Sequence, residues 1–309
     1  MSAATAVDTR VSIGSVALPN PVLAASGTFG YGTEYEGLVD LGAIGALCVQ
    51  GLSLRPAPGK PAPRLVETPG GVLNAIGLQN IGVDAFLRER LPVLRAAGAR
   101  VVANFWGDSA DEFAACAERL DGQPGLVALE LNAASPNRPE WGSILATDPV
   151  ALGAIVRTVR TRVSQLPLWV KLSPNVSDIA AVGRAAEGEG ADALSAINTL
   201  RGMAIDAGTR RPRLASVTGG LSGPAIKPVA LAMVHALARA VRIPIVGLGG
   251  IRTGEDVAEF LIAGAHAVQV GTASFYDPRA PERIGRDLAR WCRRHGVSAA
   301  RDLIGTLAT

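Results

Sequence analysis

Eight short apolar runs recur along the chain, and stretches with apolar residues at three- and four-residue spacing lie between them. Continuous apolar runs are typical of strands that are buried on both faces of a parallel sheet, and the longer spacing is typical of amphipathic helices. The runs cover residues 21–25, 44–50, 100–104, 126–132, 168–172, 193–198, 243–248 and 267–271; the periodic stretches cover 83–97, 110–120, 149–163, 176–189, 227–241, 254–263 and 281–295. This alternation predicts an α/β protein, a closed (β/α)8 TIM barrel that forms a single domain over residues 1–309.

A doubly wound open sheet is the main alternative. Its dinucleotide-binding form carries a Gly-x-Gly-x-x-Gly turn after the first strand, and no such turn follows residues 21–25. The pattern therefore favours the barrel. A short alternating stretch over residues 11–18 predicts a hairpin beneath it.

Three segments are longer than ordinary connectors: residues 51–81, 133–147 and 199–224. All three follow predicted strands, so we expect them at the carboxyl ends of the strands, where barrel enzymes build their sites. Their Gly, Pro, Asn and Ser content suggests ordered functional loops with tight turns, although a mobile lid would have a similar composition. The site is expected at this face of the barrel.

Composition excludes several classes of protein. The 30 Lys and Arg residues against 27 Asp and Glu residues give a net charge of +3, and the cations are dispersed, so we predict no nucleic-acid binding. No apolar stretch approaches the roughly 18 to 20 residues of a membrane span, and the first ten residues lack an apolar signal core. The three separated cysteines fit neither a disulfide framework nor a metal site. A cytoplasmic protein without membrane association or bound metal is expected.

Glycine-rich turns follow the last two predicted strands, at residues 246–251 and 270–273. Backbone N–H groups at such turns can approach an anion closely, helped by the start of the following helix. These two positions are the usual phosphate site of a barrel, so we predict a phosphate cradle rather than tight turns alone. A third glycine turn at residues 219–223 is either part of the same cradle or a hinge.

Polar side chains at the ends of the other runs predict a ligand pocket. Lys171 lies in an apolar run, and a buried cation needs a partner, either a ring-shaped ligand, which we favour, or a carboxylate elsewhere in the chain. Asn104, Asn132 and Asn198 end three of the runs, and their amides can read the donors and acceptors of a planar ring. Trp106 is expected either to line this pocket or to pack, and the same holds for Trp141.

Five segments together resemble the class 1 dihydroorotate dehydrogenases, most closely the NAD-linked 1B type. They are Asn-Pro-Val-Leu-Ala-Ala-Ser-Gly-Thr-Phe-Gly at 20–30, Leu-Asn-Ala-Ile-Gly-Leu-Gln-Asn at 73–80, Val-Lys-Leu-Ser-Pro-Asn at 170–175, Ile-Asn-Thr-Leu at 197–200 and Thr-Gly-Gly-Leu-Ser-Gly-Pro-Ala-Ile-Lys-Pro at 218–228. The similarity extends from about residue 11 to residue 305, and the combination is far more specific than any one motif.

The resemblance implies an FMN-dependent oxidoreductase that converts dihydroorotate to orotate in pyrimidine biosynthesis, with hydride passing from C6 to flavin N5 while a base removes a C5 proton. The residues it implies for FMN are Ala25, Ser26, Gly27, Gln50, Asn104, Asn132, Lys171, Ile197, Gly223, Gly249, Gly250, Gly271 and Thr272. Those implied for the substrate are Asn74, Gly77, Leu78, Asn132, Asn137, Asn198 and Thr199, with Ser135 as the catalytic base. The resemblance also implies a homodimer.

Two positions depart from the family pattern. The class 1 base is a cysteine and the matching residue is Ser135, while a lysine that touches flavin and substrate corresponds to Gln50. A serine needs a neighbouring base or a polarising site where a thiol does not. These changes predict weakened activity, a paralogue acting on another cyclic amide or enone, or a flavin-binding subunit with little activity.

The electron acceptor is left open by the sequence. No iron–sulfur cysteine cluster or dinucleotide motif is present, so transfer to NAD requires a separate electron-transfer subunit carrying iron–sulfur and FAD. Transfer to fumarate, quinone or oxygen requires no such partner.

Overall fold

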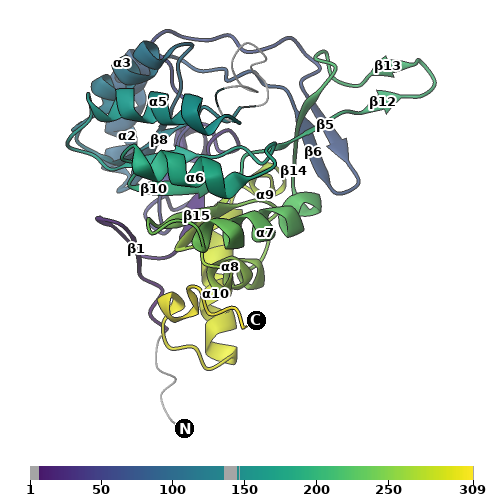
Figure 1. The fold of residues 1–309 in the computed structure, drawn as a ribbon. Helices are drawn as coiled ribbons and strands as arrows, with labels where there is room; N and C mark the ends of the chain where they lie inside the picture. The colour runs from purple at the N-terminus through teal and green to yellow at the C-terminus, as the bar shows by residue number, and fades with distance from the viewer. Residues whose placement is uncertain (1–6, 136–144, 146, 309) are drawn as a thin grey trace.

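Eight parallel strands close into a barrel in the computed structural model, which describes residues 7–135, 145 and 147–308 (Figure 1). Around the barrel the order is β10-β15-β16-β3-β4-β7-β8-β9. The strands are β3 (Val22–Ala24), β4 (Leu47–Cys48), β7 (Val101–Phe105), β8 (Leu126–Leu131), β9 (Leu168–Lys171), β10 (Ala193–Ala196), β15 (Ile245–Leu248) and β16 (Ala267–Val270). Each falls in one of the eight apolar runs or extends it by one residue, so the predicted barrel is confirmed.

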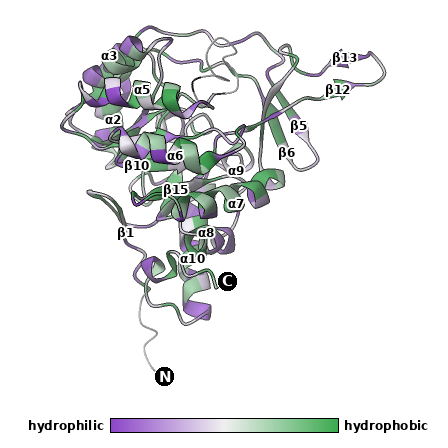
Figure 2. Ribbon diagram, in the orientation of Figure 1, coloured by the Kyte–Doolittle hydropathy of each residue, from purple (hydrophilic) through white to green (hydrophobic). Residues whose placement is uncertain are grey.

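Helices lie outside the barrel between successive strands (Figure 1). They are α1 (Val83–Ala85), α2 (Leu91–Ala96), α3 (Ala110–Leu120), α5 (Pro149–Arg160), α6 (Ile179–Gly188), α7 (Lys227–Ala238), α8 (Gly254–Ile262), α9 (Ala273–Tyr276) and α10 (Ala280–Arg294). Side-chain caps begin several of them: Ser109 accepts from the backbone of Glu112, and Asp178 accepts from that of Ala181. Figure 2 shows hydrophilic and hydrophobic residues on the same outer helices, such as α3 and α5, as expected where one face packs on the barrel.

The periodic stretch 83–97 is not one α-helix. It contains α1, a π-helical segment η2 (Phe86–Arg90) and then α2, with Pro92 near the start of α2. Proline has no N–H to donate to the preceding turn, so the backbone there adopts a wider turn. Period alone could not reveal this change of helix type.

Two of the three long connectors build a second sheet beyond the carboxyl ends of the barrel strands. Its order is β11-β14-β6-β5, with β5 (Leu65–Thr68) and β6 (Gly71–Asn74) from the first connector and β11 (Leu200–Gly202) and β14 (Gly219–Ser222) from the last. An outlying pair, β12 (Ile205–Asp206) and β13 (Arg211–Pro212), extends from it (Figure 1). The predicted ordered loops are confirmed there, whereas most of residues 133–147 lies outside the described ranges.

A hairpin of β1 (Val11–Ile13) and β2 (Val16–Leu18) packs against the inside of the barrel. Val11, Ile13, Val16 and Leu18 are buried in one cluster with inward-facing strand residues such as Trp169 and Val246. Burial of these side chains is the physical reason for the hairpin, which was expected at this place. The described residues also include three short 3-10 segments: η1 (Thr33–Tyr35), η3 (Pro224–Ile226) and η4 (Ala300–Leu303).

Candidate active site

The inward-facing side chains of the barrel form two layers of opposite character. The lower layer is apolar and takes one residue from each strand: Leu23, Cys48, Val102, Ala128, Trp169, Ala193, Val246 and Ala267. Side chains two positions apart on a strand point the same way, so the next layer toward the carboxyl ends is Ala25, Gln50, Asn104, Glu130, Lys171, Ser195, Leu248 and Gln269. Most of this second layer is polar, and it forms the floor of the site.

A cavity of about 560 Å³ lies over this floor at the carboxyl ends of the strands. Lys171 and Gln269 reach it from the polar layer, and the connectors supply its walls. The volume falls within the roughly 300–1,000 Å³ that is usual for cofactor and small-molecule sites.

Most residues that the sequence predicted for cofactor or substrate line this one cavity. From the cofactor set they are Ala25, Ser26, Gly27, Gln50, Asn132, Lys171, Ile197, Gly223, Gly249, Gly250, Gly271 and Thr272; from the substrate set they are Asn74, Gly77, Leu78, Asn132, Asn198 and Thr199, with Ser135 beside them. Residues that are far apart in the chain, such as Ala25 and Thr272, thus share one pocket. Their assigned roles remain predictions.

Two predicted residues lie elsewhere, and two more are not described. Asn104 is fully buried in the polar layer behind Asn132 and is not among the residues that line the cavity. Trp106 packs in the core and donates to the carbonyl of Gly51, so of its two expected roles the packing role holds. Asn137 and Trp141 lie outside the described residues.

Glycines at one end of the cavity hold the backbone in conformations that side chains would obstruct. Gly249 has a φ of +129°, and a Cβ there would lie 2.6 Å from the Cβ of Ala230. Gly223 has a φ of +102°, and a Cβ there would lie 2.6 Å from the Cα of Gly71. Such positions expose backbone groups to a ligand at close range. Beside them the Thr272 hydroxyl donates to the hydroxyl of Ser222, which also lines the cavity and was not among the predicted site residues.

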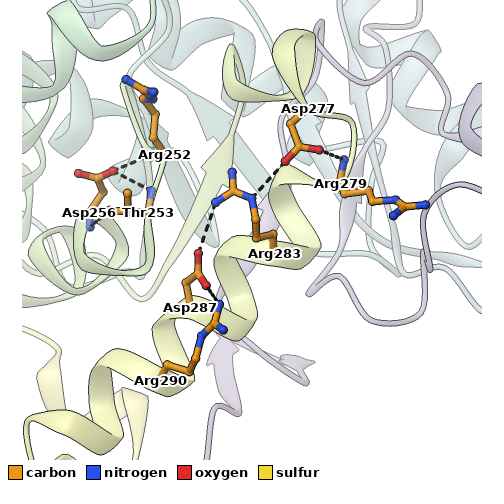
Figure 3. A network of polar contacts seen from close by, with 8 residues as sticks. All are labelled: Arg252, Thr253, Asp256, Asp277, Arg279, Arg283, Asp287 and Arg290. Carbon is orange, nitrogen blue, oxygen red and sulfur yellow. Dashed lines mark hydrogen bonds and ion pairs between the residues drawn. The ribbon is translucent and has the colours of Figure 1, made fainter.

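The start of α8 contributes less to this cradle than we expected. Asp256 accepts hydrogen bonds from the backbone N–H groups of Arg252 and Thr253, and Thr253 accepts from that of Asp256, so three N–H groups are taken by an internal cap (Figure 3). The predicted phosphate cradle therefore depends more on the glycine backbone than on the start of α8.

Ion pairs brace the cradle from behind. Lys227 donates to Asp256 at 2.6 Å and to Glu259 at 2.7 Å, and a Cβ on Gly250 would lie 2.7 Å from the Cβ of this lysine. Burial opposes the charges, but these hydrogen bonds outweigh it, so the pKa of Lys227 is raised and that of Asp256 is lowered. The brace holds the chain around Gly250 in place.

At the rim, Arg283 of α10 joins two carboxylates. Its guanidinium donates to Asp277 at 3.1 Å and to Asp287 at 3.3 Å, while Arg290 contacts the same Asp287 (Figure 3). Arg283 and Asp277 both line the cavity. This network fixes the segment between α9 and α10 at the edge of the site.

The partner of Lys171 is a carboxylate from the neighbouring strand. Its Nζ lies 3.8 Å from Oε2 of Glu130, whose side chain is fully buried. The alternative of a carboxylate partner is therefore realised, although Lys171 also lines the cavity. Glu130 interrupts the apolar run 126–132 just as Lys171 interrupts 168–172, so the same criterion could have found it.

Gln50 and Ser135 both line the cavity. The side-chain amide of Gln50 donates to the backbone carbonyl of Gln79 at 2.9 Å, and the side chain of Gln79 accepts from Arg64. Gln79 thus connects Gln50 to the positively charged guanidinium of Arg64. Ser135 is 4% exposed.

A buried acceptor in the cavity fits a flat ring with an N–H group. Oε1 of Gln269 has no hydrogen-bond partner among the described residues, although the side chain lines the cavity. A ligand N–H would satisfy it. Lys171 and the glycine turns line the same cavity, so the residues together fit a phosphorylated ring such as FMN.

The fold and site define a (β/α)8 barrel with glycine-rich turns and an amide-lined pocket at the carboxyl ends of its strands. The family model for dihydroorotate dehydrogenase matches residues 9–291. The chain therefore belongs to the dihydroorotate dehydrogenase family.

Individual relatives agree in sequence and in fold. A protein of Trichlorobacter lovleyi, named dihydroorotate dehydrogenase B (NAD(+)), catalytic subunit, is 54% identical over 297 residues, or 96% of this chain and 97% of the relative. A protein of Solibacter usitatus, named provisionally as dihydroorotate dehydrogenase A (fumarate), is 54% identical over 296 residues, with the same two coverages. The crystal structure of the Eimeria tenella dihydroorotate dehydrogenase with ferulenol superimposes with a TM-score of 0.82 at 21% identity, covering 97% of this chain and 88% of that one, which supports the fold.

None of the helices in the described ranges is both long and apolar enough to cross a membrane. Among the same residues, no group of three or more His, Cys, Asp or Glu side chains is arranged to hold a metal ion.

Proposed function

We propose that this protein oxidises dihydroorotate to orotate, with FMN bound in the cavity and Ser135 as the proton acceptor. One observation carries the proposal: a single cavity holds the glycine cradle, Lys171 and the amides of Asn74, Asn132 and Asn198. The first two features suit a phosphorylated flavin, and the amides suit the carbonyl and N–H groups of a pyrimidine ring. Membership in the family and the 54% identity to a named catalytic subunit support the same reaction.

Bound FMN would supply the hydride acceptor. The residues of the chain then divide the remaining work by position. Gly223, Gly249 and Gly250 would hold the phosphate through backbone groups, and Lys171 would hold the ring from the floor. Orotate forms when C5 of dihydroorotate loses a proton and C6 loses a hydride, so a proton acceptor must lie at the substrate side of the cavity. Ser135 lines the cavity and would accept that proton.

We propose that Ser135 and Gln50 replace the cysteine and lysine of related enzymes. Serine is a weaker acid than a thiol, whose reference pKa is about 8.5, so Ser135 depends on a polar path for its proton. Gln50 donates a neutral hydrogen bond in place of a charged one. Slower turnover than in a cysteine-containing relative is the expected consequence.

The electron acceptor is proposed from the relatives' names. The Trichlorobacter lovleyi and Geobacter sulfurreducens proteins are named catalytic subunits of the NAD(+)-linked type, so we propose a separate electron-transfer subunit with iron–sulfur and FAD groups. A homodimer is proposed as well. Size-exclusion chromatography with light scattering tests the dimer, and reoxidation of the reduced protein by NAD or by fumarate, each added alone, tests whether the chain needs the extra subunit.

The deciding experiment uses the purified protein under anaerobic conditions. Dihydroorotate is added in stoichiometric amount, and the flavin absorbance near its long-wavelength maximum is followed together with orotate formation. Bleaching with one orotate per flavin supports the proposal. Bleaching only by another cyclic amide or enone would instead assign a different substrate, and bleaching by no such compound would indicate a flavin-binding subunit.

A further inference from the structure

Glu130 is the acceptor at the centre of the polar layer. Its Oε1 accepts from Ser195 Oγ and from Gln269 Nε2, both at 2.6 Å, and its Oε2 accepts from Asn104 Nδ2 at 2.6 Å. These donors come from β10, β16 and β7, so one carboxylate on β8 joins strands from both sides of the barrel. A carboxylate can accept hydrogen bonds but has none to donate.

That asymmetry determines the orientation of a row of amides. Because Asn104 must present its NH2 group to Glu130, its Oδ1 faces the next residue and accepts from Asn132 Nδ2 at 3.3 Å. Oδ1 of Asn132 then accepts from Asn198 Nδ2 at 3.4 Å and from the backbone of Ala134 at 3.3 Å. Every bond in the row points toward Glu130. The last two asparagines line the cavity.

The same carboxylate also orients the side-chain amide of Gln269. Its NH2 group is directed to Glu130, which leaves Oε1 as the acceptor without a described partner. Without Glu130, the amide could turn over and present a donor at that point instead. The floor of the cavity therefore offers an acceptor at Gln269, and the wall offers the remaining N–H groups of Asn132 and Asn198.

We propose that Glu130 is a positioning residue that sets the hydrogen-bond polarity of the cavity and so selects rings with a matching pattern of N–H and carbonyl groups. It is not among the residues that line the cavity, and it acts through Asn104, Gln269 and its ion pair with Lys171. In its application to FMN and orotate this inference rests on the proposed function. The row of amides itself is a property of the polar layer alone.

Glu130→Gln keeps the size of the side chain and removes the acceptor-only character. Its amide must place NH2 toward either Asn104 or Gln269, and one branch of the row then reverses. The double variant Glu130→Gln with Asn104→Asp reverses the roles of the two positions. The glutamine would donate to the new carboxylate, which in turn accepts from Asn132, so every bond beyond it keeps its direction. Asn104→Asp alone places two carboxylates in contact and completes a double-mutant cycle.

Ser195→Ala is the matched control. It also removes a hydrogen bond to Glu130, but it leaves the orientations of Asn104 and Gln269 unchanged. Ser195 is buried and is not among the residues that line the cavity. A role in stability alone predicts that this variant and Glu130→Gln weaken binding in proportion to their loss of thermal stability.

The measurements are the dissociation constant of orotate from the change in flavin absorbance, the dissociation constant of FMN from fluorescence quenching, and the melting temperature of the apoprotein. We expect Glu130→Gln to weaken orotate and FMN binding roughly 10- to 100-fold. The double variant should recover the part of that loss that comes from the reversed amides, although it does not restore the ion pair of Glu130 with Lys171. Ser195→Ala should change binding less than about threefold.

Two results would overturn the inference: a double variant that binds and melts no better than Glu130→Gln, or a Ser195→Ala variant that loses binding as Glu130→Gln does. If the wild-type protein neither binds orotate nor reacts with dihydroorotate, the proposed function fails. The FMN affinities of the variants then still test the role of Glu130. If the protein takes up no FMN, recovery of the apoprotein melting temperature in the double variant decides it.

Discussion

Lys171 Nζ lies 3.8 Å from Glu130 Oε2 inside the barrel, and both side chains are almost completely buried. The lysine also borders the cavity, so one charge stabilises the barrel floor and faces the site. Removing either partner leaves the other charged and buried, which costs far more than losing a surface pair.

Lys171→Met should therefore lower the free energy of unfolding by about 3–5 kcal/mol and abolish tight FMN binding. Urea unfolding and flavin content measure the two effects. Arg160→Met is the control, since Arg160 pairs with Asp192 at the surface at 2.9 Å and should cost less than about 1 kcal/mol. Similar losses in the free energy of unfolding for the two variants would show that the buried ion pair stabilises the protein no more than the surface pair does.

Ser135→Cys and Gln50→Lys should both raise turnover of dihydroorotate. The thiol is the easier group to deprotonate, and a lysine at position 50 adds a charged hydrogen bond worth about 1.5–3 kcal/mol, or roughly 10- to 100-fold in affinity for orotate. Steady-state kinetics across pH gives the first effect, and titration with orotate gives the second. Ser135→Ala should abolish proton abstraction while leaving FMN bound. No gain from the double replacement would mean that the rest of the pocket serves another substrate.

Gly249→Ala should weaken FMN binding at least tenfold, because its Cβ would lie 2.6 Å from Ala230 in a backbone conformation that side chains rarely adopt. Fluorescence quenching measures the affinity. Gly188→Ala is the matched control: it lies at the end of α6 with no atom within 4 Å of the added Cβ, and we expect slightly higher stability with unchanged FMN affinity. Equal effects of the two changes would remove the argument for a glycine-specific cradle.

Asp256 should make stability depend on pH in the acid range. Its pKa is lowered in the folded protein because hydrogen bonds from Lys227 and the loop outweigh the effect of burial. A lowered folded pKa contributes stability that is complete above the unfolded value of 3.8 and is lost as pH falls through the folded value. Urea unfolding between about pH 2 and pH 6 should show this loss in the wild type and a flatter profile in Asp256→Asn. A variant that loses stability on acidification as steeply as the wild type would contradict the assignment.

The barrel and much of its site follow from local sequence pattern. Strands buried on both faces are mostly apolar, so the eight runs could be recognised without knowing which strands pair with one another. The glycine turns after β15 and β16 and the amides at the strand ends could be assigned to one site, because the carboxyl ends of parallel strands meet at one face of the barrel.

The partners of the buried polar groups were decided by the tertiary structure alone. Glu130, Ser195 and Gln269 lie up to 139 residues apart, yet they form one cluster because closure of the barrel turns their side chains to a common centre. Which polar residues meet depends on the register between neighbouring strands, and that register arises from packing across the whole barrel rather than from any local motif. The sequence by itself determined where the pocket would be, and the closed barrel determined which carboxylate lies beneath it.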